Sequence, residues 1–162
     1  MPRYDGKSQF IKAARARLDD GFRLLERNEG ARVIHTRGAM YLGGYALECA
    51  LKVYIIQSER ANTLTEAVDR LRQKERGRQE RRRIPDLATA AGHRLSLLLA
   101  LTNLEGQIEH GSTLWRQLQL SFQWQSNWRY DPTQPSEEDA RRFLTAVKDT
   151  YNWIKGKLSK SL

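Results

Sequence analysis

The longest predominantly apolar stretch of the chain, residues 39–57 (AMYLGGYALECALKVYIIQ), has the periodicity of a buried helix. Apolar residues recur along it at steps of three and four positions, which places one stripe on a single face: Leu42, Ala46, Cys49, Val53 and Ile56. A second stripe beside it is aromatic and charged: Tyr41, Tyr45, Glu48 and Lys52. We expect this helix to run from about residue 32 or 36 to residue 59 and to form the centre of the fold.

Two features of this run refine the prediction. Glu48 precedes Lys52 by one helical turn, the order that favours an ion pair on a helix. Gly43 and Gly44 each cost about 1 kcal/mol of helix propensity relative to Ala, which a helix tolerates where a neighbour must approach closely. Charged residues at the centre of the run argue against a membrane span.

Helical periodicity also appears before and after this run. The segment from Ser8 to about residue 27 repeats apolar residues at three and four positions, and Ser8 is its expected N-cap. The first half of residues 62–83 is expected to be helical as well. Its short apolar face is formed by Leu64, Val68 and Leu71.

The second half of the chain has clearer helix ends. The leucine-rich segment 86–105 is expected to form a helical unit divided near Gly92. Ser112 is the expected N-cap of the next helix, and Ser136, followed by three acids, is that of the last helix. Because no segment reads as a strand, we predict an all-α fold. The expected form is an antiparallel up-and-down four-helix bundle with an additional short helix, in one domain covering residues 1–162.

Charge adds a second pattern. The formal net charge is +9, which favours an anionic partner, with nucleic acid ahead of a membrane surface. Much of this charge lies in one segment, whose basic residues are Arg70, Arg72, Lys74, Arg76, Arg78, Arg81, Arg82 and Arg83. Residues 70–85 are therefore expected to form a basic insertion or loop, either a solvated helix or a mobile segment. It contacts RNA phosphates or is simply a solvated surface, and it lacks aromatic residues for base stacking.

Cysteine and histidine exclude several classes of chemistry. Cys49 is the only cysteine, so an intrachain disulfide is impossible, and a reducing, cytoplasmic setting is expected. His35, His93 and His110 are scattered without the spacing of metal ligands, so neither a metal nor another cofactor is predicted. The amino terminus lacks the apolar core of a secretion signal.

Four pieces of the chain together resemble the HEPN domain family. In chain order they are YLGGYALECALK (41–52), GHRLSLLL (92–99), the cluster Trp124, Trp128, Arg129 and Tyr130, and a closing helix with Glu138-Asp139-Ala140, Phe143-Leu144 and Trp153-Ile154. The resemblance implies a small helical bundle that commonly forms a homodimer. It also implies roles in RNA metabolism, nucleotidyltransferase partners, and prokaryotic toxin–antitoxin or defence systems.

Many proteins of that family are metal-independent endoribonucleases with an Arg followed, four to six residues later, by a His. Arg129 matches this arginine, but the positions for the histidine hold Gln134, Pro135 and Ser136. None of these residues exchanges a proton near neutral pH as histidine does. The sequence therefore favours the fold and argues against the family's nuclease chemistry.

Several candidate residues keep two interpretations. Arg129 contacts a phosphate or nucleotide, or it stacks on Trp128 or Tyr130 or pairs with Asp131. Glu48 and Lys52 line a cleft or form an intrahelical ion pair, and a buried Glu48 has Arg129 as a candidate partner. His93 is a substitute proton carrier or a packing residue.

Three function classes follow from these alternatives. The first is a non-nucleolytic module that binds RNA, a nucleotide or a protein partner. The second is a divergent ribonuclease using Arg129 with His93 or Tyr130, and the third is a dimerisation subunit.

Overall fold

The protein is all-α in the residues that the structure, a computed structural model, describes: 6–26, 35–76, 84–87 and 89–158. The α-helices are α1 (Lys7–Arg23), α2 (Thr36–Ser58), α3 (Leu64–Arg76), α4 (Leu95–Ala100), α5 (Thr113–Ser121) and α6 (Glu137–Leu158). Three short 3₁₀ helices complete the order: η1 (Ala90–His93), η2 (Glu105–Gln107) and η3 (Ser126–Tyr130). No strand occurs in these residues, and one isolated bridge joins Gly6 to Thr63. The predicted all-α class is confirmed.

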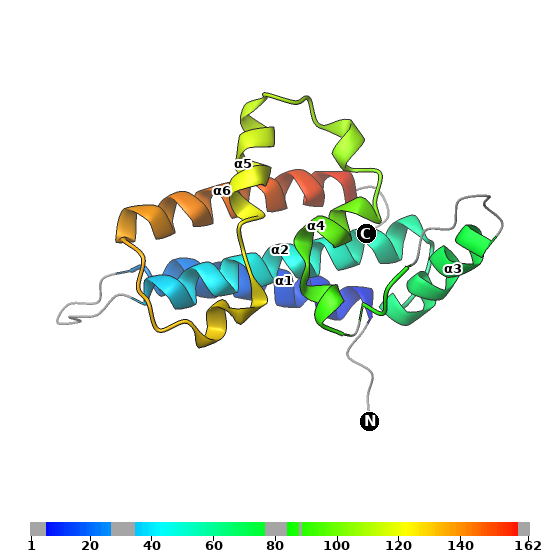
Figure 1. Ribbon diagram of the computed structural model, residues 1–162, viewed down its shortest axis with the longest axis horizontal. Helices are drawn as coiled ribbons and strands as arrows, with labels where there is room; N and C mark the ends of the chain where they lie inside the picture. Colours follow the sequence, from blue (N-terminus) through cyan, green and yellow to red (C-terminus); the bar gives the residue numbers. More distant parts are fainter. Residues whose placement is uncertain (1–5, 27–34, 77–83, 88, 159–162) are drawn as a thin grey trace.

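Helix α2 lies at the centre, between α1 and α6 (Figure 1). α1 runs antiparallel to α2, whereas α6 runs in the same direction as α2, and α5 crosses α6 at a steep angle (Figure 1). The expected antiparallel arrangement of consecutive helices is found for α1 and α2. Between α3 and α6 the chain is divided among short helices instead of one long return helix.

The two glycines of α2 let its neighbours approach closely, as predicted. A Cβ atom at Gly43 would lie 2.4 Å from Cδ2 of Leu144 on α6. At Gly44 it would lie 2.0 Å from Cδ1 of Trp124, whose indole N–H donates to the Tyr41 carbonyl at 3.1 Å. The neighbour at Gly44 is thus an indole from the segment before η3, not another helix.

The helix starts follow the sequence signals in two cases out of three. The Ser112 hydroxyl accepts the Trp115 N–H at 3.1 Å, and the Ser136 hydroxyl accepts the Asp139 N–H at 3.0 Å. The prediction for Ser8 is wrong, because α1 already begins at Lys7 and Gly6 is its N-cap. The Gln9 side chain takes the capping role by accepting the Gly6 N–H at 3.0 Å.

The structure shows which part of the basic segment is helical. α3 continues to Arg76, so residues 70–76 belong to a helix and not to a loop. Residues 77–83 lie outside the described residues.

The leucine-rich unit is divided at Arg94 into η1 and α4, and α4 buries Leu95, Leu98 and Leu99.

Length and composition alone would allow α2 to cross a membrane. In the protein, 78% of its most apolar window is buried. The core helix of a water-soluble protein shows this kind of burial. The charges of Glu48 and Lys52, which argued against a membrane span, lie inside this buried helix.

Replacing Gly44 by Ala tests the close packing on α2. We expect the free energy of unfolding to fall by about 2 kcal/mol, because the new methyl group overlaps the Trp124 ring. Urea denaturation measures this change.

Gly156→Ala is the matched control, since its added Cβ has no atom within 4 Å beyond its own stretch of α6 and the site is helical. We expect this variant to gain up to about 1 kcal/mol from helix propensity. Equal effects of the two substitutions would contradict close packing at Gly44.

Candidate functional site

A buried carboxylate joins three candidate residues. Glu48, 1% exposed, receives the Lys52 Nζ at 2.6 Å on Oε1 and the His93 Nδ1 at 3.0 Å on Oε2. We call these residues the Glu48 cluster. The predicted intrahelical ion pair is confirmed. The partners of the Glu48 oxygens are Lys52 and His93, and Arg129, the candidate partner, stacks on Tyr130 instead.

The local structure explains how this cluster forms. Lys52 follows Glu48 by one turn of α2 and is 6% exposed, so its ammonium stays beside the carboxylate. His93 ends η1, and its neighbour Gly92 packs against the Leu87 backbone, where a Cβ would lie 1.8 Å from the carbonyl oxygen. The His93 side chain remains 41% exposed. The cluster therefore joins α2 to η1 and has one accessible member.

Lys52 and His93 also line a cleft of about 380 Å³. Apolar residues of three segments form its walls: Phe10, Leu64, Val68 and Leu87. Thr65, Asp69, Arg72 and Asp86 are its other lining residues. Because His93 Nδ1 is held by Glu48, Nε2 is the ring nitrogen left for a molecule in the cleft. The arrangement offers a ligand an ammonium donor at Lys52 and an imidazole acceptor at His93 Nε2.

Arg129 and Tyr130 form a second, exposed feature on η3. The Arg129 guanidinium lies 4.6 Å from the centre of the Tyr130 ring, and Tyr130 is 75% exposed. The stacking interpretation of Arg129 is therefore confirmed. Asp131, the alternative partner considered for Arg129, is bound by Arg37 at 3.1 Å, and the Arg37 guanidinium covers the Trp128 ring at 4.8 Å.

The positions where the nuclease histidine would lie have structural contacts. Gln134 Oε1 accepts hydrogen bonds from the Thr36 hydroxyl at 3.1 Å and the Arg37 N–H at 3.2 Å. The Pro135 carbonyl accepts from the same Thr36 hydroxyl at 2.8 Å. Ser136 caps α6. These residues fasten the segment before α6 to the start of α2.

The described part of the basic segment is largely engaged within the molecule. Arg70 donates to the carbonyls of Glu59 and Arg60 at 2.8 and 2.9 Å and pairs with Glu66. Lys74 pairs with Glu59 at 2.6 Å.

Two more arginines belong to this part of the segment. Arg72 lies 3.5 Å from Asp69 and donates to the Ile84 carbonyl, and Arg76 is exposed at the end of α3. Arg78, Arg81, Arg82 and Arg83 lie outside the described residues. Because Arg70 and Lys74 bind neighbouring residues of the same chain, a structural role is favoured for these two side chains.

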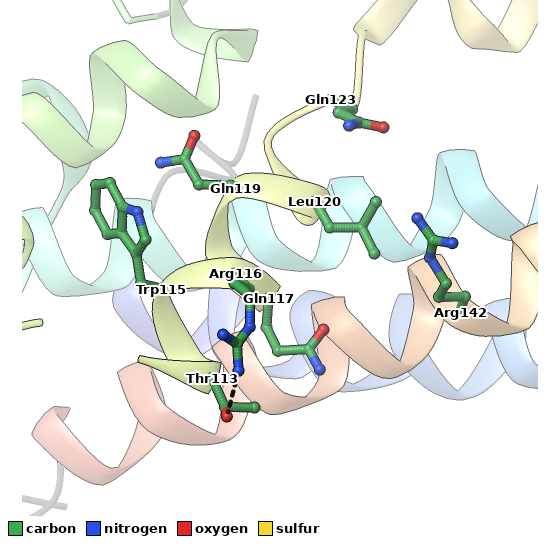
Figure 2. Close-up of a pocket in the computed structure, with 8 residues that line it drawn as sticks. All are labelled: Thr113, Trp115, Arg116, Gln117, Gln119, Leu120, Gln123 and Arg142. Carbon is green, nitrogen blue, oxygen red and sulfur yellow. Dashed lines mark hydrogen bonds between the residues drawn. The ribbon is translucent and has the colours of Figure 1, made fainter. Parts of the chain in front are cut away.

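A larger hollow of about 480 Å³ lies between α5 and Arg142 of α6 (Figure 2). Arg116 donates to the Thr113 hydroxyl there at 3.1 Å, and glutamines form much of the remaining lining (Figure 2). Its lining has no Asp, Glu or His, so no group titrates near neutral pH. The hollow therefore has less capacity for chemistry than the cleft beside the Glu48 cluster.

Neither thiol chemistry nor a metal cluster appears in the described residues. Burial raises the pKa of the Cys49 thiol to about 12, with the nearby Glu48 charge acting in the same direction. A thiol with this pKa is a poor nucleophile at neutral pH. No group of three His, Cys, Asp or Glu side chains is placed to hold a metal ion within the described ranges.

The chain matches no protein-family model, no curated protein and no solved structure. Function must therefore be inferred from the Glu48 cluster with its cleft and from the exposed pair on η3. The sequence indicated all five residues of these two features but not the contact between Glu48 and His93. The available signal for this contact was weak. It consisted of a histidine that follows a glycine and of an acid on an apolar helix.

Lys52→Met tests whether the Glu48 carboxylate depends on its ammonium partner. We expect the free energy of unfolding to fall by about 3 kcal/mol, because a buried charge loses one of its partners. The double variant Glu48→Leu/Lys52→Met should recover most of this loss, since no buried charge remains. Thermal and urea denaturation measure both variants, and an equally unstable double variant would argue against the charge effect.

Cys49 provides a probe of burial. We expect a thiol reagent to label the native protein at pH 7 to 8 only as fast as the protein unfolds, because the buried thiol stays protonated. Labelling in urea should be fast and complete. Rapid labelling without denaturant would show that this face of α2 is open.

Proposed function

We propose that this chain is a HEPN-type helical module that binds RNA through the Arg129–Tyr130 pair on η3. The single observation that carries the proposal is the exposed ring of Tyr130, 75% accessible, beneath a guanidinium. Tyr130 is the one large hydrophobic residue that is exposed among the described residues. An exposed aromatic ring with an adjoining arginine suits an unpaired base and its phosphate.

The charge of the chain supports this choice of partner. A net charge of +9 attracts a polyanion, and Arg129 places part of that charge next to a stacking surface. Arg70 and Lys74 are engaged in internal contacts, so they contribute less to RNA contact than their number suggests. The stacking pair, rather than the basic segment, is therefore the proposed centre of the interface.

The HEPN assignment is supported by the order of the elements. The glycine-containing helix α2 is central, the aromatic cluster lies between α5 and α6, and a serine-capped helix follows it. The proposal includes the family's usual homodimer, its RNA or nucleotide ligand and a nucleotidyltransferase-type protein partner. It also includes a cytoplasmic place in a defence or toxin–antitoxin system.

Binding is favoured over cleavage by the surroundings of Arg129. Its side chain stacks on Tyr130, while Gln134 and Ser136 have structural contacts. His93, the other candidate proton carrier, is held by Glu48 and lines a cleft that Arg129 does not line. Within the described residues of one chain, the ribonuclease alternative therefore has the phenol of Tyr130 beside its arginine but no imidazole.

Filter retention of single-stranded RNA tests the proposal. Tyr130→Ala and Arg129→Ala should each weaken RNA binding by roughly tenfold, since one stacked base contributes about 1–3 kcal/mol. Lys12→Ala removes a positive charge from an exposed position of α1 and should have a small effect. Equal losses in Arg129→Ala and Lys12→Ala with no loss in Tyr130→Ala would indicate a general charge effect and contradict the stacking surface.

The same protein incubated with structured RNA and no metal separates binding from catalysis. We expect intact RNA by gel electrophoresis. Cleavage that depends on Arg129 would overturn the binding proposal in favour of the nuclease.

A further inference from the structure

The cleft beside the Glu48 cluster has the features of a second binding site. We infer that it takes a small zwitterion of the α-amino acid class with an apolar side chain, held by the residues of α1, α2, α3 and η1. This inference is independent of RNA binding, because Arg129 and Tyr130 do not line the cleft.

The cationic side of the cleft is suited to a carboxylate. The Lys52 ammonium has three N–H donors, and the contacts of the described residues give it one Glu48 oxygen and the Phe10 ring at 5.8 Å. An almost fully buried ammonium needs further acceptors. The His93 and Arg72 side chains line the same space, and Arg72 adds a second cation. A ligand carboxylate accepts from the Lys52 ammonium and the Arg72 guanidinium, whereas the Nε2 lone pair of His93 accepts from a ligand N–H.

The acidic side chains of the cleft argue against a more strongly anionic ligand. Asp69 and Asp86 line it together with Lys52 and Arg72, and Glu48 lies behind it. These groups nearly cancel in formal charge, so a dianionic phosphate gains little net attraction. Arg72 and Asp69 lie 3.5 Å apart on α3, so a ligand with an ammonium beside its carboxylate extends an existing ion pair. A molecule with one group of each sign therefore complements the lining.

The walls and the size of the cleft define the rest of the ligand. Phe10, Leu64, Val68 and Leu87 present apolar surface to it. Its volume of about 380 Å³ lies toward the lower end of the range for ligand sites, which favours a small molecule. An apolar amino-acid side chain would lie against these walls and leave both charged ends beside the polar residues.

Calorimetric titration of the full chain with L-phenylalanine and L-leucine tests this inference. Two analogues accompany them: 3-phenylpropanoate, which lacks the ammonium, and phenethylamine, which lacks the carboxylate. We expect an amino acid to bind and both analogues to bind at least about tenfold more weakly, since each loses a charge-assisted contact. Absence of amino-acid binding at millimolar concentration, or equal binding of either analogue, would overturn the inference.

Two variants locate the site. Thr65→Trp fills the cleft from an exposed position of α3 and should abolish binding. His93→Ala leaves a Glu48 oxygen without its imidazole and should weaken binding by about tenfold. Arg142→Ala, in the hollow of Figure 2, is the control and should bind normally.

Circular dichroism checks that each variant is folded. If Thr65→Trp does not fold, Thr65→Phe replaces it. Unchanged binding in the filled variant, or displacement of the amino acid by single-stranded RNA, would place the ligand elsewhere and contradict the assignment.

Discussion

A carboxylate that is almost completely removed from water governs the arrangement of this molecule. A buried ionised Glu48 is tolerated only because both oxygens have partners, one from its own helix and one from η1. The contact with Lys52 is local, whereas the contact with His93 spans 45 residues. Through it, the segment before α4 is held against the centre of α2. The same contacts give the adjoining cleft its ammonium and its imidazole.

Close packing around α2 fixes the other end of the molecule. Gly43 and Gly44 admit Leu144 and Trp124, so α6 and the segment before η3 lie directly on the helix backbone. Arg37 then binds Asp131 and covers Trp128, which fastens the segment between η3 and α6 to the start of α2. η3 is thereby presented at the surface with Arg129 and Tyr130. The small residues and the polar start of α2 therefore determine both the packing around this helix and the position of the candidate interface.

The sequence predicted those features that depend on short spacing. The central helix, the caps at Ser112 and Ser136 and the Glu48–Lys52 pair each involve residues within one or two turns of one another. Contacts between distant segments were not predictable in this way. Periodicity cannot show that His93 meets Glu48, or that Arg37 rather than Arg129 binds Asp131, because many arrangements of the same helices satisfy the same apolar pattern. The direction of α6 relative to α2 is likewise not predictable from apolar spacing.

The proton position on the His93 ring tests the central contact most directly. Long-range nitrogen–proton correlation spectra, recorded where the ring is neutral, distinguish its two tautomers. The Glu48 carboxylate against Nδ1 predicts that the proton lies on Nδ1 and that Nε2 carries the lone pair. The Glu48→Gln variant should no longer enforce this preference. A neutral His93 with its proton on Nε2 in the wild-type protein would contradict the contact on which the cleft and the position of η1 depend.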